Sequence, residues 1–284
     1  AERLDRERRR LFESLTGEQT PELLHQHSRL IDEYLRSSFE ASWIGPKMPF
    51  VSNPYAIIAL GGYGRGEQCL HSDVDLLFLF QKSVPNESEQ LIREIVYPLW
   101  DIKLEVGYTI QSINACVRLA KDDYEVLTAL LDARFICGIS SVYAELQENL
   151  RKRLLKRMPR HIMKWLVSRN SQRHEDFGDS SYLLEPNLKE GNGGLRDYHT
   201  MRWLAAIAYG LKETRDLEYM GCLSHYEYNE LTDALAFIWA ARNQLHSLAG
   251  RKCDQLYFPY QSQAAQAMGF VEAEGQSPVE RFLG

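Results

Sequence analysis

The sequence predicts an α+β fold, in which a small mixed β-sheet with flanking helices is followed by an all-helical domain. Three short apolar runs in the first part of the chain have the length and composition of β-strands. Between the second and third runs, apolar residues recur at helical spacing instead. From Asp122 onward almost the whole chain has a helical pattern. We expect a helical segment over 1–50, the sheet-containing core over 51–118 and the helical domain over 119–284.

The first part of the chain supplies one long helix and two strands. Thr20 suits a helix N-cap and is followed by a proline, which suits the first helical position. A first strand is expected over Tyr55–Leu60, where it ends at a pair of glycines. The second, Val74–Phe80, is apolar at nearly every position, as expected for a strand covered on both faces.

A helix over 87–100 and a third strand over 104–110 complete the expected core. In the helical domain, Ser224 and Glu227 have the spacing of a capping box. The helix that they begin extends to Gly250, a suitable C′ residue.

Charge and hydropathy exclude several classes of partner. The 284 residues carry a formal net charge of −6, so no overall positive field is present to hold an extended nucleic acid. No apolar run approaches the roughly 20 residues that a membrane-spanning helix needs. The charged N-terminus lacks the apolar core of a signal peptide, so we expect a cytoplasmic protein. The five cysteines are scattered, which disfavours disulfides and thiolate zinc sites.

Two acids enter the second expected strand at alternate positions. Side chains at i and i+2 of a strand lie on one face, so Asp73 and Asp75 present neighbouring carboxylates. Two adjacent anions need a cation, and Mg²⁺ characteristically combines one or two carboxylates with substrate phosphates. Just upstream, Gly61 and Gly62 allow backbone N–H groups to approach phosphate oxygens. The combination predicts a site for metal and triphosphate.

The third expected strand adds another acid, Glu105. Three carboxylates can hold two metal ions, and we expect two Mg²⁺ ions here, with Mn²⁺ as the alternative. Glu105 would then help to activate the acceptor hydroxyl. Asp101 is the alternative for this role. Glu105 is favoured because an acid between Leu104 and Val106 needs a compensating partner if it is buried.

These motifs resemble a known family. The run from Gly61 to Glu67, with Ser72-Asp73-Val74-Asp75 after it, resembles the polymerase-β-type nucleotidyltransferase signature. More narrowly, the chain is similar to the uridylyltransferase/uridylyl-removing enzymes that modify the PII nitrogen-signalling protein. The similarity also includes residues 99–107, 184–197 and 242–258, although Tyr108 stands where histidine is expected.

The resemblance implies transfer of UMP from UTP to a tyrosine of PII, with release of pyrophosphate. The family's HD phosphohydrolase and glutamine-sensing ACT domains would lie beyond Gly284, so we expect neither the removing reaction nor the glutamine response from these residues. Metal binding and catalysis are assigned to Asp73, Asp75 and Glu105. Nucleotide binding is assigned to Gly61, Gly62, Arg65, Ser72, Lys189, Gly194, Arg196 and Asp197.

Two features of the helical domain allow two interpretations each. The glycine-rich loop before the expected helix Leu195–Tyr209 either binds anions with the help of Lys189 and Arg196, or is a turn between helices. The second feature is a polar stripe on the helix that begins after Ser224, and it either lines a cleft or forms a solvated edge. The stripe contains Arg242, Asn243, His246 and Ser247.

Two other functions compete with the leading one. The first is a nucleotidyltransferase that uses a different acceptor or nucleoside triphosphate, because acceptor choice depends on surfaces that one sequence does not reveal. The second is a nucleotide-binding regulatory module without turnover. A complete set of metal-binding acids disfavours this module, since a sensor has no need of one.

Overall fold

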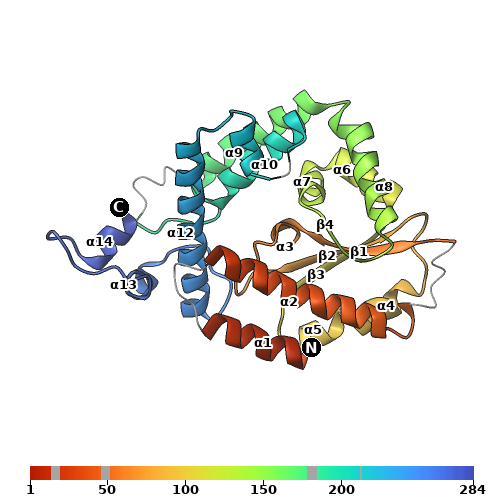
Figure 1. The fold of residues 1–284 in the computed structure, drawn as a ribbon, viewed down its shortest axis with the longest axis horizontal. Coiled ribbons are helices and arrows are strands. Elements are labelled where there is room, and N and C mark those ends of the chain that lie inside the picture. The colour runs from red at the N-terminus through yellow and green to blue at the C-terminus, as the bar shows by residue number, and fades with distance from the viewer. Residues whose placement is uncertain (14–19, 46–51, 178–183, 212) are drawn as a thin grey trace. The chain divides into compact units, whose positions relative to one another are not determined.

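The computed structural model describes residues 1–13, 20–45, 52–177, 184–211 and 213–284 (Figure 1). The chain folds as two compact units. The first contains Ala1–Glu13, Glu22–Gln68 and Ser72–Pro159, and the second contains Cys69–His71 and Arg160–Gly284. Within the described residues, every helix is too short or too polar to span a bilayer.

A four-stranded mixed sheet forms the centre of the first unit. Strand β2 (Val74–Phe80) lies between β1 (Tyr55–Leu60), to which it runs antiparallel, and β3 (Val106–Ser112), to which it runs parallel. Strand β4 (Arg134–Gly138) pairs antiparallel with β1, which gives the order β3-β2-β1-β4. The mixed sheet confirms the predicted fold class, and β1 and β2 have the predicted bounds.

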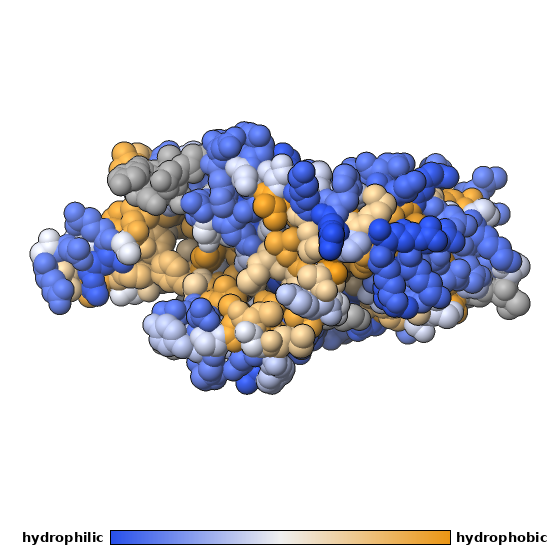
Figure 2. All heavy atoms as spheres, turned by 90° about the horizontal axis from the view of Figure 1, so that it is seen from above, coloured by the Kyte–Doolittle hydropathy of each residue, from blue (hydrophilic) through white to orange (hydrophobic). Residues whose placement is uncertain are grey.

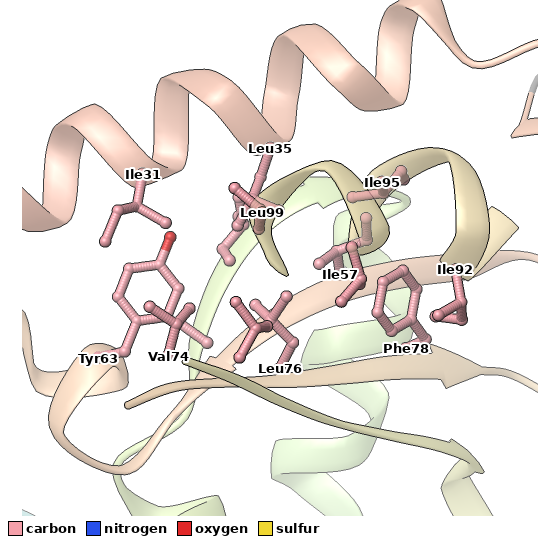
Figure 3. Packing of buried hydrophobic residues seen from close by; sticks show 14 of the residues in the cluster. Ile31, Leu35, Ile57, Tyr63, Val74, Leu76, Phe78, Ile92, Ile95 and Leu99 are labelled. Carbon is pink, nitrogen blue, oxygen red and sulfur yellow. The ribbon is translucent and has the colours of Figure 1, made fainter. Parts of the chain in front are cut away.

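One face of this sheet packs on the main hydrophobic core. Alternate β2 side chains, among them Val74, Leu76 and Phe78, are buried there with residues of α2 (Thr20–Ala41), α4 (Ser88–Ile95) and α5 (Tyr97–Asp101), as Figure 3 shows. Helix α8 (Ser140–Leu150) contacts β1, β2 and β4. Apart from Asp75, β2 is buried along its whole length, as its apolar sequence predicts.

The structure differs from the sequence-based prediction at several elements of the first unit. The glycine-rich loop after β1 contains a short helix, α3 (Gly61–Arg65), and the helix expected over 87–100 is divided into α4 and α5. Helix α1 (Glu2–Glu13) precedes α2. Strand β4 lies in the part that we expected to be all helical, between α7 (Tyr124–Leu131) and α8, with α6 (Ile113–Asp122) before them. The first unit, which includes β4, extends to Pro159, so position 118 lies inside it, and the domain bounds stay a prediction.

The second unit is helical. Helix α12 (His225–Ala249) has the predicted capping box of Ser224 and Glu227, and it ends at Gly250 in the left-handed conformation with φ of 63°. It packs on α13 (Phe258–Ala267), which contacts α14 (Pro278–Leu283). The remaining helices are η3 (Arg151–Leu155) at the end of the first unit, and α9 (Pro159–Phe177), α10 (Leu195–Tyr209) and α11 (Arg215–Tyr219).

Hydrophilic residues cover much of the face drawn in Figure 2, with apolar residues among them. Several large apolar side chains are exposed, including Leu184 and Tyr219 of the second unit. Exposed apolar residues of this kind are ordinary on folded proteins, so they do not by themselves define a site.

Candidate active site

The carboxylate of Asp75 occupies a gap between two glycines. A methyl group built on Gly107 would lie only 2.9 Å from Asp75 Oδ1, and one built on Gly61 would lie 3.6 Å from Oδ2. Strand pairing explains both contacts, because Asp75 is opposite Leu60 of β1 and opposite Gly107 of β3. Asp75 is exposed while the rest of β2 is buried. The sheet therefore presents one carboxylate to solvent beside the start of α3.

Asp73 lies at the entry of β2, where its backbone is held on two sides. The buried amide of Gln68 donates hydrogen bonds to the carbonyl oxygens of Ser72 and Asp73, at 2.7 and 3.1 Å. The next peptide joins the sheet, since Val74 N donates to Glu105 O at 2.9 Å. Asp73 immediately precedes β2, and strand alternation predicts that it shares the face of Asp75. The sequence-based prediction missed Gln68, which carries no charge and belongs to no metal-binding pattern.

Glu105 immediately precedes β3 and stays a predicted member of the site. Its neighbours Leu104 and Val106 are buried in the core, so alternation predicts that Glu105 faces the side of Asp75. The sequence analysis favoured Glu105 because a buried acid at this position would need a partner. That premise is wrong, because Glu105 is exposed. The rival, Asp101, is also exposed and ends α5, outside the strand.

Tyr108, which stands where the family pattern has histidine, lies on the other face of β3. Its ring is 6.5 Å from that of Phe78 and 6.1 Å from that of Trp100, and Phe78 belongs to the main core. The departure from the pattern therefore lies away from the three carboxylates.

The acids fit one metal more readily than a preformed two-metal centre. Among the residues that the structure describes, no three His, Cys, Asp or Glu side chains are gathered as a metal site. A pair of carboxylates completed by phosphate oxygens is nevertheless the usual donor set for Mg²⁺. Asp75 of β2 and Asp73 just before this strand would provide such a pair, so the residues present fit a magnesium ion that arrives with its nucleotide. The third ligand and the second metal stay predictions.

Arg65 has a structural role in the described molecule. Its side chain is only 7% exposed and lies between two carboxylates, with Nε 2.6 Å from Glu67 and Nη1 2.5 Å from Asp132. Burial disfavours the charge, but the two carboxylates outweigh it and hold the pKa of Arg65 above its usual value. These contacts tie α3 to the end of α7. A contact between Arg65 and a triphosphate stays a prediction that this geometry does not favour.

A second ion pair, between the buried Asp32 and the partly exposed Arg134, supports α3 from β4. Arg134 binds the Asp32 carboxylate with both terminal nitrogens and donates to the carbonyl oxygens of Tyr63 and Gly64. The Tyr63 hydroxyl donates to Asp32 at 2.6 Å. The sequence analysis did not single out these residues, because they are far apart along the chain and β4 was not predicted.

In the second unit, the predicted nucleotide-binding residues of the glycine-rich loop form an ion-pair network. Arg196 binds Glu190 at 3.0 Å, and Lys189 lies 4.0 Å from the same carboxylate. Burial, together with nearby cations, lowers the pKa of Lys189. Gly194 is the N-cap of α10. Asp197 accepts hydrogen bonds from Gly193 N at 2.7 Å and from Arg173, and His174 Nε2 is 2.7 Å away.

The polar stripe of α12 is neither a solvated edge nor a cleft wall, and this corrects both interpretations for three of its four members. Arg242, Asn243 and His246 are buried, while Ser247 is exposed. Arg242 binds Asp254 at 2.7 Å. Asn243 and His246 accept hydrogen bonds from the backbone of the Cys69–His71 segment, at 3.0 and 3.2 Å. The stripe thus anchors backbone within the second unit.

Comparison with known proteins gives this geometry a context. Residues 161–284 match the family described as GlnD PII-uridylyltransferase, and residues 5–117 match the family described as putative nucleotidyltransferase DUF294. The chain is thus similar to PII-uridylyltransferases over most of its length.

Two curated relatives carry the description "bifunctional uridylyltransferase/uridylyl-removing enzyme". The protein from Ruegeria pomeroyi is 38% identical over 228 residues, which cover 80% of this chain and 25% of the relative. The one from Rhodospirillum rubrum is 35% identical over 261 residues, covering 91% of this chain and 28% of the relative. This chain thus spans about a quarter of the length of these relatives.

Proposed function

We propose that this chain transfers UMP from UTP to a tyrosine hydroxyl of a PII-type signalling protein and releases pyrophosphate. The observation that carries the proposal is the exposed Asp75 carboxylate between Gly61 and Gly107, in a chain whose relatives are named uridylyltransferases. The cytoplasmic location expected from the sequence is part of this proposal.

Each residue of the site has a distinct proposed task. Asp73 and Asp75 would hold Mg²⁺, and the ion would neutralise charge on the triphosphate. The backbone of Gly61 and Gly62, at the start of α3, would lie against phosphate oxygens, since neither residue carries a side chain. Glu105 would accept the proton of the attacking hydroxyl. Ser72, Lys189, Gly194, Arg196 and Asp197 stay predicted nucleotide contacts.

The reaction balances with these groups alone. The tyrosine oxygen forms a bond to the α-phosphorus of UTP, and the bond from that phosphorus to the oxygen bridging to the β-phosphorus breaks. The hydroxyl proton passes to the Glu105 carboxylate and then to water. Pyrophosphate leaves with the bridging oxygen. The two-metal form of this mechanism is the version that the three predicted carboxylates would support.

The test is incubation of the chain with Mg²⁺, a PII protein and each labelled nucleoside triphosphate in turn. Labelling of PII by UTP is the expected result, and labelling by ATP would indicate a different base preference. Absence of labelling with all four triphosphates would overturn the proposal. The control is Asp75→Asn, which keeps the side-chain size but removes a metal-binding charge. It should lower transfer by roughly a thousandfold while leaving the unfolding transition in place.

A further inference from the structure

A chain of hydrogen bonds runs from helix α1 to the entry of β2 through the side chains of Arg8 and His27 and then through the backbone and side chain of Gln68. Arg8 Nε donates to His27 Nε2 at 2.9 Å, and His27 Nδ1 lies 2.8 Å from the main-chain carbonyl oxygen of Gln68. The Gln68 amide then donates to Ser72 O and Asp73 O. All three side chains are at most 8% exposed. The two N-terminal helices thus connect to the backbone that carries Asp73.

The two carbonyls that Gln68 binds belong to the peptide groups on either side of the Asp73 Cα atom. Fixing both peptide planes fixes the direction in which the Asp73 side chain leaves the backbone. The residue after Asp73 is also held, because Val74 N donates a hydrogen bond to Glu105 O. Asp73 is therefore oriented by a side chain before it and a strand after it.

The donor and acceptor roles of these groups determine which nitrogen of His27 carries the proton and how the Gln68 amide is oriented. Arg8 is only a donor, so His27 Nε2 must accept and Nδ1 must carry the proton that Gln68 O receives. A flipped Gln68 amide would direct its oxygen at two carbonyl oxygens. In the orientation present, Gln68 Oε1 is buried with no hydrogen-bond partner among the described residues. A buried, unsatisfied acceptor costs about 1–3 kcal/mol, so this arrangement carries a cost that an apolar side chain would avoid.

We propose that Gln68 is a positioning residue for the metal-binding carboxylate of Asp73, and that His27 and Arg8 hold Gln68 in place. The inference rests on the proposed function, because it assigns Asp73 to the metal. Groups that orient metal-binding residues typically change metal affinity by about 10–100-fold when they are removed. The proposal gives the N-terminal helices, whose function the sequence analysis left open, a part in the site.

The test is a titration of the full chain with Mn²⁺ in the presence of a non-hydrolysable UTP analogue. The concentration of free Mn²⁺ is measured by electron paramagnetic resonance. Gln68→Met keeps the length of the side chain but removes both donated hydrogen bonds, and it should raise the Mn²⁺ dissociation constant by about tenfold or more. UTP-analogue affinity without metal should stay within about twofold, since the variant leaves the nucleotide contacts in place.

A matched control exists in the second unit. Gln261 is also buried, and its amide also donates to two carbonyl oxygens, those of Leu184 and Leu256, at 2.6 and 3.1 Å. Gln261→Met removes the same bonds and should leave the Mn²⁺ dissociation constant unchanged. An equal effect of both substitutions, or no effect of Gln68→Met, overturns the proposal.

Variants of His27 provide a second test if Gln68→Met does not fold. Asparagine at position 27 retains a donor near the Nδ1 position, whereas alanine retains none. His27→Asn should therefore bind Mn²⁺ more tightly than His27→Ala, and equal dissociation constants overturn the proposal. Failure of the unaltered chain to bind Mn²⁺ with the analogue would instead overturn the metal assignment in the proposed function. The two failures are thus distinguishable.

Discussion

Asp32 and Arg134, which are 102 positions apart in the sequence, meet in a two-point ion pair next to helix α3. Arg134 Nη1 is 2.5 Å from Asp32 Oδ2, and Nη2 is 3.1 Å from Oδ1. The same guanidinium donates to backbone carbonyls of α3. The pair joins α2 to β4 and fixes the short helix that begins at Gly61, so the proposed phosphate-binding backbone depends on it.

Removal of one partner of this pair should destabilise the first unit. Arg134→Met leaves the Asp32 carboxylate, which is 5% exposed, without its main counter-charge. The expected loss is about 3 kcal/mol in the free energy of unfolding, measured by urea denaturation. The double variant Asp32→Asn with Arg134→Met should recover part of that loss, because no uncompensated charge is left. Strict additivity of the two single changes would contradict the coupling.

A methyl group at Gly107 should disturb Asp75 without disturbing the strand. Gly107→Ala places a carbon 2.9 Å from Oδ1, so the carboxylate must turn away. The backbone at Gly107 is not in the left-handed region, so alanine adds no backbone strain there. Mn²⁺ affinity should fall by roughly tenfold, as when a group that orients a metal ligand is lost. An unchanged affinity would show that Asp75 does not bind the ion in this rotamer.

Arg196 offers a test of the glycine-rich loop. If it binds the triphosphate, Arg196→Ala weakens UTP binding, whereas Glu190→Gln tightens it by releasing the guanidinium from its 3.0 Å ion pair. We expect changes of about 3- to 10-fold in the dissociation constant, in opposite directions, by isothermal titration calorimetry. If both variants bind UTP like the unaltered chain, the loop is a turn between helices.

His246 should make stability depend on pH. Burial is the main cause that lowers the pKa of His246 to about 4, below its usual value near 6.5. The unfolded chain therefore takes up a proton first as pH falls, and stability decreases between about pH 6.5 and pH 4. The loss attributable to this residue is on the order of 3 kcal/mol.

The matched variant for this pH dependence is His246→Asn, which does not titrate. Its side-chain oxygen can still accept from His71 N, as His246 Nδ1 does. Urea unfolding at pH 7 and at pH 4.5 should show a smaller decrease in this variant than in the unaltered chain. Equal decreases would assign the pH dependence to other groups.

Elements with one dominant local pattern were predictable from the sequence. Strands β1 and β2, helix α10 and the Ser224 capping box have apolar runs, periodicity or caps that no neighbouring segment contradicts. Strand β4 is short and only one of its five residues is fully buried, so its pattern is weak. It exists because β1 offers an unpaired edge, and this is a tertiary cause that local sequence does not contain.

The residues of the candidate site likewise include some that local sequence predicts and some that it does not. Spacing alone predicts Asp73 and Asp75 on one strand face, and it predicts Glu105, which immediately precedes β3, on that face as well. The supporting residues were not predictable, because Gln68, His27 and Asp32 become significant only through partners that are distant in sequence. The charge of Arg65 suggested a phosphate ligand, but charge does not reveal that two carboxylates are already bound to it.

The position of β4 at the edge of the sheet affects synthesis on the ribosome. Strands β1, β2 and β3 are synthesised first. One edge of β1 stays unpaired until Arg134–Gly138 has been translated. During that interval the nascent chain exposes a row of unpaired N–H and C=O groups, which other chains can capture. Truncated products that stop before Arg134 also lack the main counter-charge for Asp32, and we expect them to aggregate or to be degraded.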